Sequence, residues 1–271
     1  MKFAKFALCQ ILLLSVGVST FAADSTAPVP SSDTEKVVVT TSINAKEVRE
    51  YKVAASIKGK MLLPDLKDPL DLDVAVSYKI RHKYSTRDND GLLPLEISML
   101  EGEITTQGEK LSMSSNLYPK LTVLSDRNWR FDGLFGVSKE QHARGLPGFS
   151  YNNLIILFYL YDGEQPHIVG DKWESNIKLP GYGDAYKFTT TLKCIEEIDG
   201  MQAASVHQDI TWKIMGADDK QLATANATAD SSFAIANGKL IKSHIECQVV
   251  PVKQEDSANT VNTKIDILLA K

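Results

Sequence analysis

Apolar and polar side chains alternate along most of the chain from residue 37 onward. The apolar side chains at every second position from Tyr51 to Ile57 share one face, and Lys52, Ser56 and Lys58 share the other. The same period of two occurs at 74–84, 93–99, 173–179, 206–214, 241–249 and 261–269. One buried and one solvated face is typical of antiparallel sheet, because parallel strands are usually covered on both faces. The pattern predicts an all-β protein.

Turn-forming residues separate these stretches. They lie at 88–91, 199–200, 216–219 and 237–238, and each segment includes a glycine. Asn-Gly and Asp-Gly supply the positive φ angles that tight hairpin turns need. A long strand, an acidic glycine turn and another strand occur in 51–99 and again in 173–214. We therefore predict two related antiparallel β lobes (curved sheets, half-barrels or sandwiches), over 37–137 and 167–271.

A short, partly helical connector over 138–166 is expected between the lobes. Ser138 and Gln141 have the spacing of a capping box, which predicts about two helical turns ending near Gly145. A continuously apolar and aromatic run follows at 154–161. Its β-branched and aromatic residues favour a buried strand, although its length leaves a helix open. We expect core, with a lid over a pocket or docking surface as the alternative.

Residues 1–22 have the composition of a secretory signal peptide. Two lysines precede an apolar stretch over 6–18, and the small residues Thr20 and Ala22 fit cleavage after Ala22. The apolar stretch is shorter than the ~20 residues that span a bilayer. Residues 23–36 are small and polar, which predicts a disordered leader. We expect an exported protein, periplasmic or secreted, with no membrane span in the mature chain.

Removal of this segment changes the charge and the cysteine count. The chain of 271 residues has three cysteines and a net charge of −4. Loss of Lys2, Lys5 and Cys9 lowers the net charge to −6 and leaves two cysteines. A chain with this net negative charge lacks the excess of positive charge that is typical of nucleic-acid-binding proteins. With 43% apolar and 24% charged residues, it is also neither disordered nor collagen-like.

The remaining cysteines, Cys194 and Cys247, are both expected to point inward. An even pair in an exported protein predicts one disulfide. It would close a loop of about 53 residues and contribute about 3–4 kcal/mol. Two unlinked buried thiols are the alternative if the strands are not adjacent, because bridged Cα atoms lie within about 7 Å.

Local signatures of a phosphate loop, a nucleophile elbow or a zinc ribbon do not occur in the sequence. We therefore expect a protein that is not an enzyme and uses no cofactor or metal. His82 lies alone on an apolar strand face, where a hydrogen-bonded core histidine is favoured over a ligand-binding or catalytic one. His207 and Asp209 share a face that could hold a metal, but their polar neighbours favour a solvated surface.

Alanine occupies four alternate positions of one predicted strand, which leaves space above the sheet. A bulky neighbour, such as an indole or the apolar connector, would fill that space. The alternative is a hydrophobic cavity for a lipid or similar ligand. The candidate cavity residues are Ala223, Ala225, Ala227, Ala229, Trp212 and His82.

Three short motifs in the second half carry a family resemblance. They are Gly170-Asp171-Lys172-Trp173, Asp199-Gly200 and Asn237-Gly238-Lys239-Leu240. In these motifs the chain resembles uncharacterised exported β-rich proteins of bacteria. The predicted architecture is also similar to that of bacterial envelope lipoprotein carriers, whose curved antiparallel sheet holds acyl chains under helical lids. This chain is about twice as long as those carriers and is predicted to have little helix, so the resemblance implies no functional residue here.

We therefore expect an exported, non-enzymatic binding module of the cell envelope or secreted space, with a lipid or other apolar small molecule as its candidate ligand. Two alternatives stay open: a structural module that contacts an envelope protein, and a hydrolase with an unrecognised site. A cavity over the alanines would favour the first hypothesis, and an exposed apolar patch or sheet edge the second. A cleft uniting a histidine, an acid and a nucleophile would favour the third.

Overall fold

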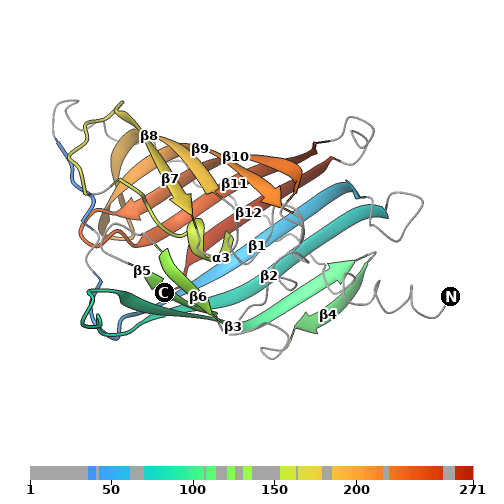
Figure 1. The fold of residues 1–271 in the computed structure, drawn as a ribbon, viewed down its shortest axis with the longest axis horizontal. Helices are drawn as coiled ribbons and strands as arrows, with labels where there is room; N and C mark the ends of the chain where they lie inside the picture. The colour runs from blue at the N-terminus through green and yellow to red at the C-terminus, as the bar shows by residue number, and fades with distance from the viewer. Residues whose placement is uncertain are drawn as a thin grey trace.

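The structure of the protein, a computed structural model, describes residues 36–40, 43–61, 70–106, 108–113, 121–125, 131–135, 153–162, 164–178, 185–215, 220–252 and 260–270. These residues form one antiparallel sheet of twelve strands (Figure 1). The strands are β1 (Val48–Met61), β2 (Leu70–Tyr84), β3 (Leu93–Thr106), β4 (Glu109–Met113), β5 (Leu121–Ser125), β6 (Phe131–Phe135), β7 (Lys172–Lys178), β8 (Ala185–Ile198), β9 (Met201–Met215), β10 (Gln221–Ala234), β11 (Leu240–Pro251) and β12 (Val261–Leu269). The predicted all-β, antiparallel class is confirmed.

The two predicted lobes are halves of a single sheet. Its strand order is β6-β5-β3-β2-β1-β12-β11-β10-β9-β8-β7, and β4 pairs with β3. β1 and β12 are neighbours at the centre, in a register that runs from Tyr51 opposite Leu269 to Gly59 opposite Val261 (Figure 1). Pairing satisfies the backbone N–H and C=O groups that two separate sheets would leave exposed along these strands. The duplication and the domain boundaries stay predictions.

Two of the predicted turns have the backbone geometry that their glycines imply. Asp199 and Gly200 have φ angles of 50° and 75° and join β8 to β9. Two consecutive positive φ values match a type I′ hairpin turn. Gly238, with φ of 61°, lies between β10 and β11. The predicted turn at 216–219, the capping-box helix, the signal peptide and all but the last residue of the leader lie outside the described residues.

The predicted apolar run at 154–161 contributes one helical turn and then irregular chain. The helix α3 spans Asn153–Ile156, so the favoured buried strand is wrong. Residues 155–161 are buried in the same apolar cluster as the inward side chains of both halves of the sheet. Figure 1 shows the sheet curving around α3. No helix among the described residues has the length and apolar character needed to cross a membrane.

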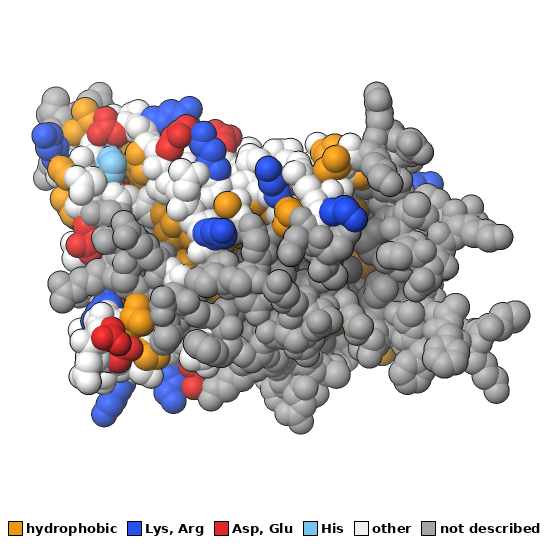
Figure 2. Space-filling view, viewed as in Figure 1, with side chains coloured by type: hydrophobic (Ala, Val, Ile, Leu, Met, Phe, Trp, Pro, Cys, Tyr) orange, Lys and Arg blue, Asp and Glu red, His pale blue; other side chains and the backbone are white. Residues whose placement is uncertain are grey.

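The two faces of the sheet differ in polarity as the period of two predicts. Along β12, residues alternate strictly between buried and exposed from Val261 to Leu268. Figure 2 shows Lys and Arg side chains interspersed with Asp and Glu over the part of the molecule where β7 to β10 run. We call the buried face the inner face and the charged face the outer face.

Candidate binding site

The four predicted cavity alanines form a row on the inner face of β10, which we call the alanine row. Their exposed fractions are 8% for Ala223, 0% for Ala225, 6% for Ala227 and 2% for Ala229. Larger side chains lie on both sides of the row. Trp212 of β9 is opposite Ala225, and Cys247 of β11 is opposite Ala227. The alanine row is therefore a low band between two ridges of side chains.

Trp212 supplies one of these ridges. Its indole is 4% exposed and stacks on Tyr186 of β8, with ring centroids 5.2 Å apart and planes inclined by 24°. It is an indole next to the alanine row, and an indole is one of the bulky neighbours expected to fill the space above the alanines. A shallow depression of about 640 Å³ lies on the outer face, directly behind Ala227. A cavity on the inner side of the alanine row stays a prediction.

A band of hydrogen-bonded polar side chains adjoins the alanine row on the inner face. Gln208, opposite Ala229, donates from Nε2 to Oγ1 of Thr190 at 3.4 Å. The hydroxyl groups of Ser231 and Ser243 lie 2.8 Å apart. All four polar side chains are buried, at 1–4% exposure. Because they bond to one another, they remain compatible with an apolar surrounding.

His82 of β2 is fully buried on the inner face, near the start of β1. Its Nδ1 atom lies 3.1 Å from the hydroxyl of Tyr159, which lies 3.0 Å from the hydroxyl of Tyr84. The His82 ring packs against Tyr51 and Phe158, with centroids 5.3 and 4.7 Å away. This hydrogen-bonded aromatic setting is that of a core histidine. A role for His82 toward a ligand stays a prediction.

Arg49 is a buried cation that the sequence analysis missed. It lies opposite His82 across β1 and β2 and is 2% exposed. Its Nε atom donates to Oε1 of Glu47 at 2.8 Å, and Nη2 donates to the backbone oxygen of Asn237 at 3.3 Å. The guanidinium also lies over the ring of Tyr84, 5.2 Å from its centroid. The signal was present, because Arg49 is in phase with the inward positions that start at Tyr51.

Two hydrogen-bond donors beside His82 lack a geometric acceptor among the described residues. Nη1 of Arg49 and the hydroxyl of Tyr51 are buried, and neither meets the geometry of a hydrogen bond with a described residue. The guanidinium still interacts with the Tyr51 hydroxyl, whose pKa it lowers. Arg49 and Tyr51 lie on the same face of β1, two positions or about 7 Å apart. Most buried polar side chains in proteins have a partner. This pair is therefore an exception that calls for an explanation.

The ionisation of these two groups follows from their surroundings. Burial alone lowers the pKa of Arg49, but Tyr84, Tyr51 and the Glu47 carboxylate together hold that pKa above its usual value. Burial raises the pKa of Tyr51, and the Arg49 guanidinium acts in the opposite direction. Arg49 is thus a cation, and Tyr51 keeps its proton. Both are donors over the whole physiological pH range.

The outer face carries two close pairs of a histidine and an acid, and in both the acid comes from a neighbouring strand rather than from the position two residues away. His207 lies 2.8 Å from Asp230, and His244 lies 2.6 Å from Asp266. Asp230 and His244 are also register partners, so the four residues form one row across β9 to β12. Asp209, which shares the face of His207, lies 3.8 Å from it. Within the described residues, no cluster of three His, Cys, Asp or Glu side chains could hold a metal ion.

The predicted disulfide between Cys194 and Cys247 is wrong, since both cysteines are free. A register shift between Leu192 and Cys194 places Cys194 opposite Ser205, on the outer face. Cys247 is on the inner face, opposite Ala227. β9 and β10 also separate the two strands, a spacing of about 14 Å. A bridge requires Cα atoms within about 7 Å, so this pair cannot form one.

Serine hydroxyls on the outer face bear on the hydrolase alternative. The hydroxyl of Ser205 donates to the Glu196 carboxylate and lies 2.7 Å from the hydroxyl of Ser232. Lys242 lies 3.9 Å from Glu196. These serines therefore bond to an acid and to each other, rather than to the neighbouring His207.

A small group of exposed apolar side chains bears on the interaction alternative. Leu222 and Val252 are 57% and 56% exposed, and Val250 is 39% exposed. The N–H of Val252 donates to the backbone oxygen of Leu222 at 3.0 Å, which joins the ends of β10 and β11. The interaction-module hypothesis requires such side chains to form a contiguous apolar patch.

Comparison with known proteins adds only distant likenesses. No family model and no curated protein matches the chain. The chain is similar to lipovitellin, in a structure of its lipid–protein interactions, with 8% identity and a TM-score of 0.45 over 84% of this chain and 25% of that one. It is also similar to DynF of the dynemicin biosynthesis pathway of Micromonospora chersina (6% identity, 93% and 92% coverage, TM-score 0.20) and to the ywiB protein of Bacillus subtilis (7%, 84% and 96%, 0.15). The chain spans a quarter of the lipovitellin chain, and these values carry no argument about function.

Proposed function

We propose that this chain is an exported binding protein that holds an apolar ligand against the inner face of its sheet. The alanine row carries the proposal. Four successive inward positions of β10 have no side chain beyond Cβ, whereas the neighbouring inward positions include Trp212, Ile210 and Val249. Alanine is a weak strand former, so its repeated use needs a reason other than sheet propensity.

The dimensions of the alanine row suit an elongated ligand. From Ala223 to Ala229 the strand rises by about 20 Å. Ridges on both sides would hold a chain-like apolar group along the strand, where it would gain about 0.8 kcal/mol for each methylene removed from water. Because the four alanines are buried, such a ligand must insert between them and the groups that cover them. Export is proposed on the sequence of residues 1–22.

The neutral fluorophore Nile red tests the proposal, with hexadecanol as competitor. Purified mature protein should raise Nile red fluorescence, and hexadecanol should displace the dye. Ala227→Ile fills the middle of the alanine row and should weaken both ligands at least tenfold. Thr228→Ile adds a similar side chain to the outer face of the same strand and serves as the matched control. Absence of Nile red and hexadecanol binding to the wild-type protein would reject the proposed function.

The stability of Ala227→Ile distinguishes a ligand site from a packed core. If bulky neighbours already fill the space, the added methyl groups should cost about 1–3 kcal/mol of unfolding free energy through overpacking. If a ligand normally occupies the space, the ligand-free variant should be about as stable as the wild type. Urea denaturation of ligand-free protein measures the difference.

A further inference from the structure

The inner face holds a second feature that the apolar ligand alone does not use. Among the described residues, the acidic partner of Arg49 is Glu47, which bonds to the Nε edge of the guanidinium. Nη2 is occupied by the backbone oxygen of Asn237. Nη1 and the hydroxyl of Tyr51 remain, both buried and both without a geometric acceptor among the described residues. Two adjacent donors, one of them positively charged, make a site for an acceptor that carries negative charge.

The surroundings of these donors favour a tightly held anionic oxygen group. Phe158 packs edge-on against Tyr51, with ring centroids 4.8 Å apart, and Tyr84 lies beside the guanidinium. In such an apolar setting a charged hydrogen bond is stronger than in water, and a buried anion must be paired and hydrogen-bonded. The guanidinium and the phenol meet both requirements.

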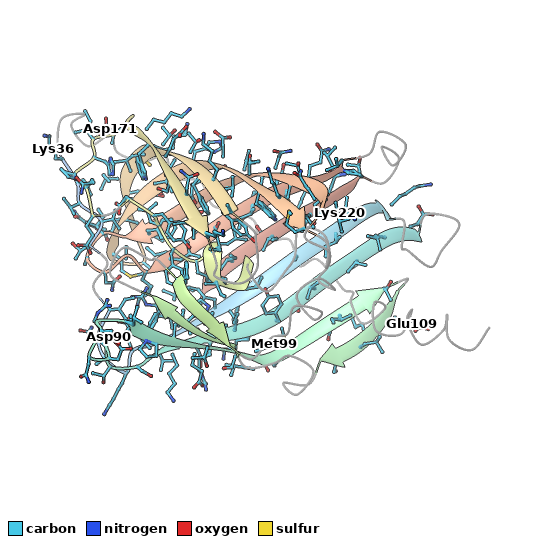
Figure 3. All side chains as sticks on the ribbon, viewed as in Figure 1. Lys36, Asp90, Met99, Glu109, Asp171 and Lys220 are labelled. Carbon is cyan, nitrogen blue, oxygen red and sulfur yellow. The ribbon has the colours of Figure 1, made fainter. Side chains whose placement is uncertain are left out.

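The position of these donors relates them to the alanine row. Tyr51 lies four positions before Ala55 on β1, and Ala55 aligns through Ile265 of β12 and Ile245 of β11 with Ala229. Four residues along the strand and three strands across give a separation of about 20 Å along the sheet. The row then runs toward the end of the sheet at Lys220, away from the end marked by Asp90 (Figure 3). An extended acyl chain of sixteen carbons that starts at Tyr51 reaches the near end of the row, at Ala229.

From this arrangement we infer that Arg49 and Tyr51 bind the carboxylate of a long-chain fatty acid whose tail extends toward the alanine row. The inference rests on the proposed function, because it assigns the polar end of the same ligand. Nη1 of Arg49 and the hydroxyl of Tyr51 each donate a hydrogen bond to the carboxylate. Glu47 remains on the opposite edge of the guanidinium and keeps it oriented.

Three probes separate the head of the ligand from its tail. Palmitate has both parts, hexadecanol has the tail without the charge, and acetate has the carboxylate without the tail. Displacement of Nile red by palmitate and by hexadecanol gives their affinities, and isothermal titration gives that of acetate. Palmitate should bind at least tenfold more tightly than hexadecanol, and acetate should bind weakly or not at all.

Tyr51→Phe is the decisive variant, because it removes one hydroxyl that has no geometric hydrogen-bond partner among the described residues. It should weaken palmitate at least tenfold and change hexadecanol by less than about threefold, since a hydrogen bond to a charged group is worth more than one to a neutral group. Ligand-free Tyr51→Phe should be as stable as the wild type or more stable. Tyr161→Phe is the matched control, because the Tyr161 hydroxyl already donates to the Ile156 oxygen at 2.9 Å. It should lose stability and keep its affinity for palmitate.

The outcomes distinguish this inference from the proposed function. Equal binding of palmitate and hexadecanol, with no effect of Tyr51→Phe on either, would overturn the carboxylate site and leave the apolar ligand in place. If acetate binds tightly and palmitate binds no more tightly than acetate, the assignment of a fatty acid is overturned. The site would then bind a small free anion. If neither palmitate nor hexadecanol binds, the proposed function fails, and the inference fails with it.

Discussion

The Nε atom of Arg49 lies 2.8 Å from Oε1 of Glu47, and the arginine side chain in this ion pair is 1% exposed. Removal of one partner from a buried ion pair leaves a charge without compensation, which typically costs about 3–5 kcal/mol. We expect Glu47→Gln to lower the free energy of unfolding by about 3 kcal/mol, near the lower limit because Glu47 itself is partly exposed. Urea denaturation at neutral pH measures this loss.

Asp230→Asn provides the comparison on the outer face. It removes the partner of His207, but the Asp230 side chain is 70% exposed. Exposed ion pairs contribute about 0–1 kcal/mol. Equal losses of stability in Glu47→Gln and Asp230→Asn would contradict the conclusion that the Arg49 charge is buried and depends on Glu47 for compensation.

Gly59 holds the close approach between β1 and β12. Its φ is +145°, and a Cβ atom there would lie 2.1 Å from the backbone oxygen of Thr260. We expect Gly59→Ala to cost about 2–5 kcal/mol through backbone strain and steric overlap. Gly91→Ala is the control, because Gly91 also has a positive φ, +79°, but no atom lies within 4 Å of its Cβ position. It should cost about 1–2 kcal/mol, and a loss as large as that of Gly59→Ala would show that strain alone is responsible.

The two cysteines should remain thiols in oxidised, purified protein. The intact mass should not change on reduction, because the thiols lie on opposite faces of the sheet. Burial raises the pKa of Cys247 to about 12, so its reactive thiolate is scarce at pH 8. Iodoacetamide should therefore modify the partly exposed Cys194 before Cys247, and peptide mass spectrometry identifies the site. A mass lower by two hydrogens before reduction would show that the disulfide forms and would contradict this prediction.

Asp162 should make stability depend on pH. Burial raises the pKa of its carboxyl to about 6, although the Glu164 N–H acts in the opposite direction. A raised pKa means that the folded state binds the proton more tightly than the unfolded state. The contribution of Asp162 to stability is therefore greatest below pH 4, falls as pH rises to about 6, and is constant above that.

Asp162→Asn removes this ionisation. At pH 7 it should raise the free energy of unfolding by about 2–3 kcal/mol, which corresponds to a pKa difference of about two. At pH 4 the variant and the wild type should be nearly equal. Urea denaturation at both pH values measures the difference, and a gain that is the same at both would assign the effect to something other than the charge.

Export predicts a defined amino terminus. When the full chain is expressed in a bacterial host with a secretion pathway, the mature protein should begin at Ala23. Amino-terminal sequencing of the exported fraction checks this. Retention of Met1 in the folded, membrane-free protein would contradict the signal peptide.

The strands were predictable because their signal is local. Alternate burial along 51–57, 223–229 and 261–269 follows directly from alternate polarity, because the pairing within these segments continues without a bulge. The turn at Asp199-Gly200 was equally local, since its chemistry restricts the backbone. The inward placement of the alanine row followed from the same period of two.

The remaining features depend on contacts that are distant in sequence. One extra residue between Leu192 and Cys194 reverses the side of the sheet on which Cys194 lies, and polarity alone does not reveal such a bulge. Arg49 is in phase with the inward face, but only the position of Glu47 and the Asn237 carbonyl makes its burial tolerable. The run at 154–161 was buried as expected, yet its secondary structure was decided by the sheet around it.

The central pairing of β1 with β12 constrains how the chain can reach its native state. The paired strands are separated by roughly 200 residues, and sheets that depend on such non-local contacts fold slowly. The edge of β1 that pairs with β12 lacks its partner until the last strand has been synthesised. If the chain is exported, that strand must also have crossed the membrane. Until then the free edge of β1 can pair with other chains. The protein should therefore depend on a chaperone that holds the chain unfolded until its carboxyl terminus is available.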